Sequence, residues 1–120
     1  MLTQDCPCGS GLTYAACCGP LHQGTAEATS AEQLMRSRYS AYALGELDHV
    51  FRTWHPRTRP PTVEPEPGVT WTGLSVLGSG EDWVEFRAAW SHGPRSGVLH
   101  EWSRFEQRRG RWVYVEGEVR

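Results

Sequence analysis

The stretch CPCGSGLTYAACCG, residues 6–19, contains all four cysteines of the 120-residue chain. A disulfide between cysteines so close in sequence would close a very small, strained ring, so the spacing argues against a disulfide framework. Thiolates suit Zn²⁺, and four of them form a closed tetrahedral shell that leaves no position for a substrate. We therefore predict one structural Zn²⁺ held by Cys6, Cys8, Cys17 and Cys18. His22 is the alternative to Cys18 as the fourth ligand.

The residues between the cysteines are suited to a tight turn around an ion. Gly9 and Gly11 allow the backbone to turn sharply and to bring amide N–H groups near the sulfur atoms. We expect Ser10 to cap the short helical turn that follows, and Gly19 to end it.

The same residues carry a resemblance, because the pattern CPCGSGxxYxxCCG is similar to the SEC-C motif. This motif is the small zinc module found at the C-terminus of the SecA translocation ATPase and in many bacterial proteins. The resemblance implies that Cys18 stands at the last ligand position, where SecA has His. The module is usually rich in lysine, whereas this chain has Leu12, Thr13, Ala15 and Ala16 at positions where lysines are frequent, so a basic docking surface is not expected.

Composition limits the partners and the compartment. Twelve basic and fourteen acidic residues give a formal net charge of −2, which argues against non-specific binding to nucleic acid. Four arginines gather near the predicted last turn, but glutamates interrupt them: Arg104, Arg108, Arg109 and Arg111. No apolar run reaches the roughly 20 residues that span a bilayer, and the start of the chain lacks the features of a secretory signal. We expect a cytoplasmic protein that binds neither membrane nor nucleic acid.

Helices are expected directly after the zinc module. Apolar residues at helical spacing predict a helix over residues 31–44, with a capping box at its start and Gly45 at its end. A second, short helix is expected over residues 46–53, where it would bury Leu47, Val50 and Phe51. Residues 56–68 hold five of the eight prolines, so this segment is expected to be an extended loop.

The remainder alternates between apolar and polar residues in the manner of an antiparallel sheet. We predict four strands, at residues 69–77, 82–90, 98–107 and 111–118. Turns are expected between them at residues 78–80, 93–97 and 109–110. Helices followed by a meander of strands define an α+β fold. One face of the third predicted strand carries Leu99, Glu101, Ser103 and Phe105.

A second resemblance rests on four segments: LMRSRY (34–39), TWHP (53–56), EWSRF (101–105) and WVYVEG (112–117). In this order they are similar to the YchJ family, also called UPF0225, over almost the whole chain. The resemblance implies an NTF2-like fold, in which helices pack into a strongly curved antiparallel sheet and form a cone with a cavity. The expected organisation is therefore a SEC-C module at residues 1–24 followed by an NTF2-like domain at residues 25–120.

Two classes of function fit this organisation. In the first, the zinc module presents a surface and the chain is an adaptor that binds protein partners, because about 20 residues cannot bury a core of their own. In the second, the cavity binds a small molecule or performs acid/base chemistry, as in the NTF2-like ketosteroid isomerase and dehydratases. No specific catalytic motif of those enzymes is present, so whether the chain is an enzyme stays open.

A specific set of residues is expected to line the cavity. The catalytic candidates are Glu101, His55 and Tyr39. The expected pocket residues are Arg36, Arg38, Tyr39, Trp54, His55, Glu101, Ser103 and Phe105. The alternative for Glu101 is a salt bridge with Arg36 or Arg38 that holds helix to sheet, and the alternative for His55 is a capping or packing role. Trp90 and Trp102 are expected to face outward, where they would suit a homodimer.

Overall fold

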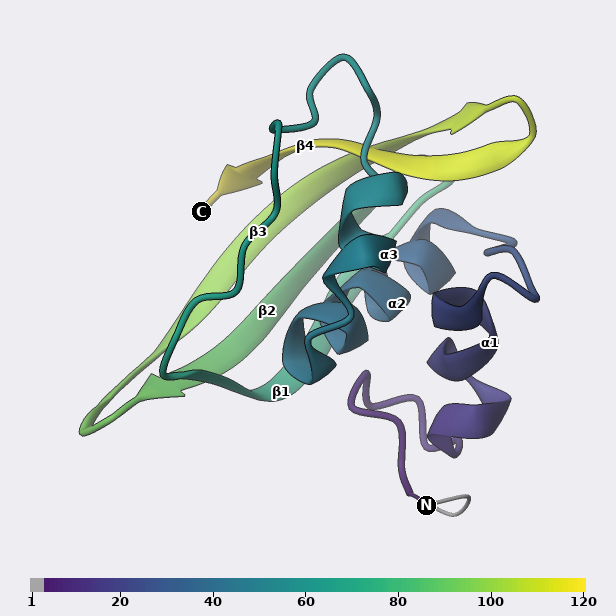
Figure 1. Cartoon of the computed structure of the whole chain (residues 1–120). Helices are drawn as coiled ribbons and strands as arrows, with labels where there is room; N and C mark the ends of the chain where they lie inside the picture. The colour runs from purple at the N-terminus through teal and green to yellow at the C-terminus, as the bar shows by residue number, and fades with distance from the viewer. Residues whose placement is uncertain (1–3) are drawn as a thin grey trace.

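A computed structural model describes residues 4–120 of the chain. A 3₁₀ turn, η1 (Tyr14–Ala16), is followed by three helices: α1 (Cys18–Gln23), α2 (Ala31–Leu44) and α3 (Leu47–Arg52). Four strands then form one antiparallel sheet in chain order: β1 (Val69–Ser79), β2 (Trp83–His92), β3 (Arg95–Arg108) and β4 (Arg111–Val119). The prediction of helices followed by an antiparallel meander is confirmed (Figure 1).

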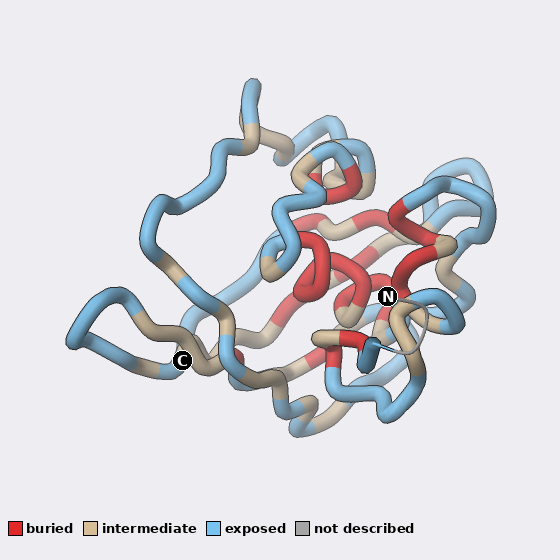
Figure 2. Tube along the Cα trace, turned by 60° about the horizontal axis from the view of Figure 1, so that its bottom comes forward, coloured by how far each residue is buried: buried red, intermediate tan, exposed pale blue. Residues whose placement is uncertain are grey.

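The helices cover one face of the curved sheet, and the cysteine-containing segment lies beside α2 at the β1 side (Figure 1). The core forms where α2 meets the sheet, with Leu34 and Met35 from the helix against Val84 and Phe105 from the strands. In Figure 2 the buried backbone is concentrated at this junction, and the long loop before β1 is largely exposed. The sheet therefore has a concave face that holds the core and a convex face turned away from the helices.

Helix α2 begins and ends where the sequence predicts. The Ser30 hydroxyl accepts a hydrogen bond from the Gln33 amide at 3.1 Å, and Gly45 ends the helix with a φ of 79°. The helix is buried on two sides, because the sheet covers one side and the cysteine-containing segment covers the other. Small polar side chains, Ser37 and Ser40, are fully buried for this reason.

The hairpin between β2 and β3 is shorter than predicted. The expected turn at residues 93–97 reduces to the two residues between His92 and Arg95, and this places Trp90 opposite Gly97. The prediction that Trp90 faces outward is therefore wrong, because its side chain lies on the concave face. Trp102 does lie on the convex face, where it stacks on Trp83 with ring centroids 6.1 Å apart.

Helix α3 buries His49 and Val50, whereas Leu47 and Phe51 are only half-buried, so the predicted set was correct for Val50 alone. After the helix the chain runs along β4, where the Tyr114 amide donates to the Thr53 carbonyl at 2.8 Å. This pairing brings Trp54 beside the Tyr114 ring. Within residues 4–120 no helix is long and apolar enough to cross a membrane.

Candidate functional site: a cysteine cluster and an inner cavity

The four cysteines converge on one point. Their sulfur atoms all lie within 4.8 Å of one another, with 3.6 Å between Cys8 and Cys17 and 3.9 Å between Cys17 and Cys18. A tetrahedral site with metal–sulfur bonds of about 2.3 Å has sulfur–sulfur edges of about 3.8 Å. The thiols fit this geometry, so the cluster could hold one metal ion.

The backbone around the cluster differs in detail from the expectation. Gly9 and Gly11 have φ of 78° and 87°, so they form the predicted tight turn. Ser10 does not cap a helix, since its hydroxyl lies 3.2 Å from the sulfur of Cys17. Gly19 lies inside α1, and the helix ends instead at Gly24, whose φ is 80°.

Hydroxyl groups surround the sulfur atoms. The Ser40 hydroxyl donates to the Cys18 sulfur at 3.3 Å and lies 3.5 Å from the Cys6 sulfur. The pKa of Cys8 is lowered to about 4, first by a hydrogen bond from Cys18 and also by the hydroxyl and backbone of Ser10. The same bond and burial raise the pKa of Cys18. Four crowded thiols cannot all ionise without a cation between them.

His22 has another role and is not a ligand in this arrangement. Its Nδ1 accepts a hydrogen bond from the Tyr14 hydroxyl at 2.7 Å, and its Nε2 donates to the Ser37 carbonyl at 2.8 Å. Both ring nitrogens are therefore occupied, and burial lowers the pKa of the imidazole. The alternative in which His22 replaces Cys18 is wrong on this geometry.

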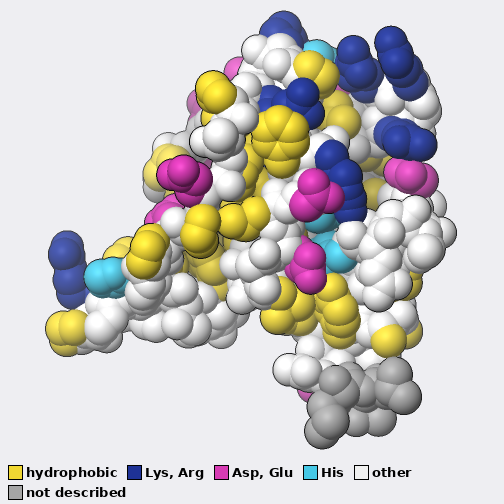
Figure 3. Space-filling view, in the orientation of Figure 1, with side chains coloured by type: hydrophobic (Ala, Val, Ile, Leu, Met, Phe, Trp, Pro, Cys, Tyr) yellow, Lys and Arg dark blue, Asp and Glu magenta, His cyan; other side chains and the backbone are white. Residues whose placement is uncertain are grey.

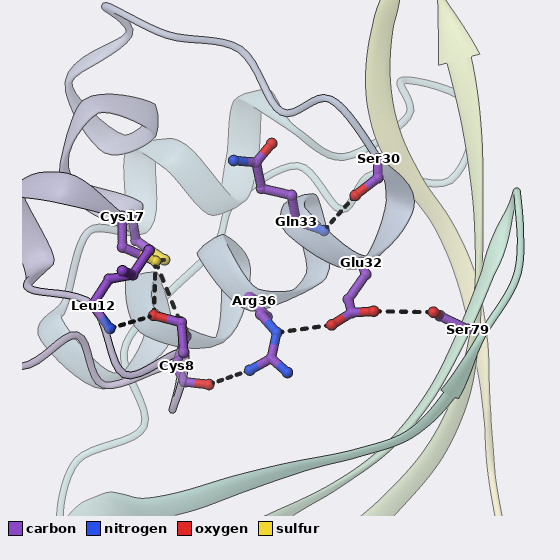
Figure 4. Close-up of polar contacts among 10 residues, drawn as sticks. Cys8, Leu12, Cys17, Ser30, Glu32, Gln33, Arg36 and Ser79 are labelled. Atoms are coloured by element: carbon purple, nitrogen blue, oxygen red, sulfur yellow. Dashed lines mark hydrogen bonds and ion pairs between the residues drawn. The ribbon is translucent and has the colours of Figure 1, made fainter.

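Arg36 joins the cluster to the domain and does not line the cavity. Its Nη1 donates to the Cys8 carbonyl at 2.6 Å, and its Nε pairs with Glu32 at 3.1 Å. Glu32 in turn accepts from the Ser79 hydroxyl at 3.0 Å, so one chain of polar contacts runs from the cysteine turn through α2 to β1 (Figure 4). The prediction that places Arg36 in the pocket is corrected by these contacts.

A cavity of about 300 Å³ lies between α2 and the concave face of the sheet. The structure brings together six of the eight expected pocket residues there: Arg38, Tyr39, Trp54, Glu101, Ser103 and Phe105. His55 lies outside, where its Nδ1 accepts from the Arg57 amide at 3.0 Å and its Nε2 is 3.8 Å from Glu106. Its backbone amide also donates to the Tyr114 carbonyl, which agrees with the packing alternative.

Arg38 is buried at one wall of the cavity. Its Nη1 donates to the Val50 carbonyl at 2.9 Å and to the Thr53 hydroxyl at 2.8 Å. The guanidinium also lies over the rings of Trp54 and Tyr114, at 5.0 and 4.6 Å from their centroids. Burial lowers the pKa of Arg38. Carbonyl, hydroxyl and ring contacts thus hold this cation, and the expected ion pair with Glu101 does not.

Glu101 is a half-buried carboxylate whose hydrogen-bond donor is the Ser103 hydroxyl, at 2.5 Å. Among residues 4–120 it forms no ion pair, so the predicted salt bridge with Arg36 or Arg38 is absent there. Gly117 makes room for the carboxylate, because a Cβ at that position would lie 2.2 Å from Glu101 Oε2. Burial and the charge of Glu101 raise the pKa of the Tyr114 phenol.

Sequence reasoning missed several residues of the cavity wall, including Tyr42, Glu66, Trp71 and Tyr114. Tyr114 carried a usable signal, since the pairing of β4 with β3 places it opposite Phe105 on the concave face. Glu66 carried none, because it belongs to the proline-rich loop, whose path over the sheet does not follow from local sequence.

The fold and the cysteine cluster together define a class of protein, an NTF2-like domain that carries an N-terminal SEC-C module. A family description reading "YchJ, middle NTF2-like domain" matches residues 30–117, and the SEC-C motif matches residues 3–20. The chain belongs to the UPF0225 (YchJ) family.

Relatives and solved structures agree with this assignment. A UPF0225 protein of Streptomyces coelicolor is 48% identical over 98% of both chains, and one of Deinococcus radiodurans is 50% identical over 94% of this chain and 88% of its own. The solution structure of a SEC-C motif protein from Rhodopseudomonas palustris has 39% identity and a TM-score of 0.86, covering 98% of this chain and 99% of that one. The crystal structure of another SEC-C motif containing protein, from Psychrobacter arcticus, has 25% identity and a TM-score of 0.78, covering 100% of this chain and 86% of that one.

Proposed function

We propose that the inner cavity binds a small, mostly apolar molecule through Glu101, and that a structural Zn²⁺ in the cysteine cluster fastens the N-terminal module to the domain. The observation that carries the first part is a half-buried carboxylate without an ion-pair partner, set among aromatic side chains. Small-molecule sites have this character, with a largely apolar wall and a few convergent polar groups.

The chemistry of the wall narrows the ligand. Burial raises the pKa values of Tyr39, Tyr42 and Tyr114, so these phenols remain neutral near pH 7. Glu101 then offers the cavity a hydrogen-bond acceptor, and the buried guanidinium of Arg38 lies at the same cavity. A ligand that donates a hydrogen bond or a proton to Glu101 fits this pattern. The volume of about 300 Å³ limits it to a compact molecule with one or two rings.

The structural role of zinc is supported by burial. Cys6, Cys8 and Cys18 are buried against α2 and β1, so a metal there would be enclosed by four sulfur ligands. A closed shell of this kind contributes folding energy and leaves no site for substrate.

The cavity proposal is tested by filling the cavity. Ala88 lies at its wall, and the next residue, Ala89, points to the convex face, so Ala88→Val and Ala89→Val form a matched pair. A library of one- and two-ring alcohols, amines and acids is screened by NMR against the zinc-loaded protein. We expect to find ligands that bind the unchanged protein and Ala89→Val with equal affinity. The same ligands should bind Ala88→Val and Glu101→Gln at least tenfold more weakly. Equal binding to all four proteins would contradict the proposal.

A second candidate function, docking of a protein partner, is favoured by one observation. Leu12 lies between the two pairs of cysteines and is 53% exposed, so the module presents a large apolar side chain at its surface. Affinity capture from host lysate with Leu12→Ser tests this candidate, with the similarly exposed Leu77→Ser as control. A partner lost only by Leu12→Ser would support docking, and the same partners with all three proteins would contradict it.

A further inference from the structure

A groove of about 820 Å³, separate from the inner cavity, lies between the segment at residues 24–28, the end of α3 and the β3–β4 hairpin. Five arginines line it: Arg52, Arg59, Arg108, Arg109 and Arg111. Glu27 is the one carboxylate among its lining residues, so the groove carries about four positive charges on a chain whose formal charge is −2. Figure 3 shows basic side chains gathered over this part of the molecule.

The carboxylates near the groove do not neutralise these arginines. Arg111 is 3.6 Å from Glu27 and Arg52 is 3.5 Å from Asp48, and both carboxylates are well exposed. Exposed ion pairs of this kind are worth about 1 kcal/mol or less, so a better anion can displace them. Within residues 4–120, Arg108 and Arg109 form no ion pair.

The backbone conformation at Arg109 also supports a binding role for this hairpin. The hairpin turns through Arg109 and Gly110, whose φ values are 56° and 79°. Such two-residue turns favour Asn or Asp followed by Gly, because other side chains are strained at positive φ. Arginine at this position is therefore a poor choice for the turn itself, and a strained residue at a groove is a signal of function.

His49 and Trp54 line the groove, and each has a ring nitrogen, Nδ1 and Nε1 respectively, that is buried without a hydrogen-bond partner in the described structure; Trp54 also lines the inner cavity. His49 is only 3% exposed. A polar atom buried without a partner is costly, and such atoms are rare in folded proteins. Both residues therefore leave hydrogen-bonding capacity unused at the wall of the groove.

We propose that this groove binds a phosphorylated small molecule of nucleotide size, with its phosphates against Arg108, Arg109 and Arg111. Arginine pairs with phosphate through two parallel hydrogen bonds, and several arginines on a short hairpin fit two adjacent phosphates. The volume lies in the range of small-molecule sites. A nucleic acid would need a longer basic track, whereas Glu106, Glu116 and Glu118 flank the groove residues in the sequence.

Isothermal titration of the zinc-loaded 120-residue chain with ADP, adenosine and inorganic pyrophosphate tests the proposal. We expect ADP and pyrophosphate to bind and adenosine to bind at least tenfold more weakly than ADP, with affinity falling as salt rises. The double variant Arg108→Ala/Arg109→Asn should weaken ADP binding at least tenfold. Arg87→Ala/Arg95→Ala removes the same charge away from the groove and should change affinity less than twofold.

The strain at Arg109 gives an independent readout. Arg109→Asn should raise the melting temperature while it weakens ADP binding, since Asn accepts positive φ more readily than Arg. A lower melting temperature would assign Arg109 a structural role and overturn this step. Absence of ADP and pyrophosphate binding at millimolar concentration, or equal loss in both double variants, would overturn the proposal. Tighter binding of a 12-nucleotide single-stranded RNA than of ADP would overturn it in favour of a nucleic-acid surface.

Discussion

Arg38 and Glu101 line the same cavity without forming an ion pair, and this predicts a small energetic coupling between them. In Arg38→Met the protein loses two hydrogen bonds from a charged donor, to Val50 and Thr53, each worth about 1.5–3 kcal/mol. It also loses two ring contacts of about 0.5–1 kcal/mol each, and it regains several kcal/mol because a charge is no longer buried. We expect a net destabilisation of about 3 kcal/mol.

Glu101→Gln should cost about 1 kcal/mol or less, because Gln also accepts from the Ser103 hydroxyl. Urea unfolding of the unchanged protein, the two single variants and the double variant completes the cycle. The coupling energy between positions 38 and 101 should be below about 1 kcal/mol. A coupling of about 3 kcal/mol or more is the value for a broken buried ion pair, and it would refute this description of the cavity.

Three further predictions concern pH, metal retention and space. Burial lowers the pKa of His49 from 6.5 to about 3, so the unfolded state takes up a proton more readily than the folded state. The free energy of unfolding should therefore fall by about 1.4 kcal/mol for each pH unit between pH 6.5 and pH 3. Urea titrations of His49→Gln should show a flatter dependence on pH. Ser40→Ala should lower zinc affinity about tenfold in chelator competition, because Cys18 loses its hydroxyl donor. Gly117→Ala should displace the Glu101 carboxylate and lower the melting temperature, whereas Gly73→Ala, which meets no atom within 4 Å, should not.

The features that sequence predicts well depend on local spacing. The cysteine cluster follows from four thiols within thirteen residues around a glycine turn, and its geometry is set almost entirely by neighbours in the chain. The face that joins Glu101, Ser103 and Phe105 follows from the two-residue period of a strand. Helix α2 follows from its cap at Ser30 and its stop at Gly45.

The features that sequence predicts poorly depend on register and on which side of a helix meets the sheet. A five-residue turn at 93–97 would place Trp90 opposite His100, whereas the observed two-residue turn places it opposite Gly97. A register shift by an odd number of residues turns every side chain of a strand to the opposite face of the sheet, which explains the error for Trp90. Arg36 and Arg38 lie on opposite sides of α2, so both could not face the sheet, and only the tertiary packing selects Arg38.

The arginine groove could not be predicted from the sequence, because tertiary packing brings its residues together. Its residues come from three separate segments, and the sequence showed only the charges near the last turn, where neighbouring glutamates obscured them. In the folded chain the arginines lie at the groove and the glutamates beside them in sequence do not line it. A count of charges along the sequence cannot show this separation.

Zinc K-edge X-ray absorption on the purified 120-residue chain shows directly whether the cysteine cluster is a closed structural metal site. We predict one zinc per chain with four sulfur ligands at about 2.3 Å, from Cys6, Cys8, Cys17 and Cys18. Removal of the metal by a strong chelator should then increase hydrogen exchange in residues 4–24 while the strands stay protected. A shell of three sulfurs and one nitrogen, or protein that is fully folded and binds no metal, would contradict a closed four-cysteine site.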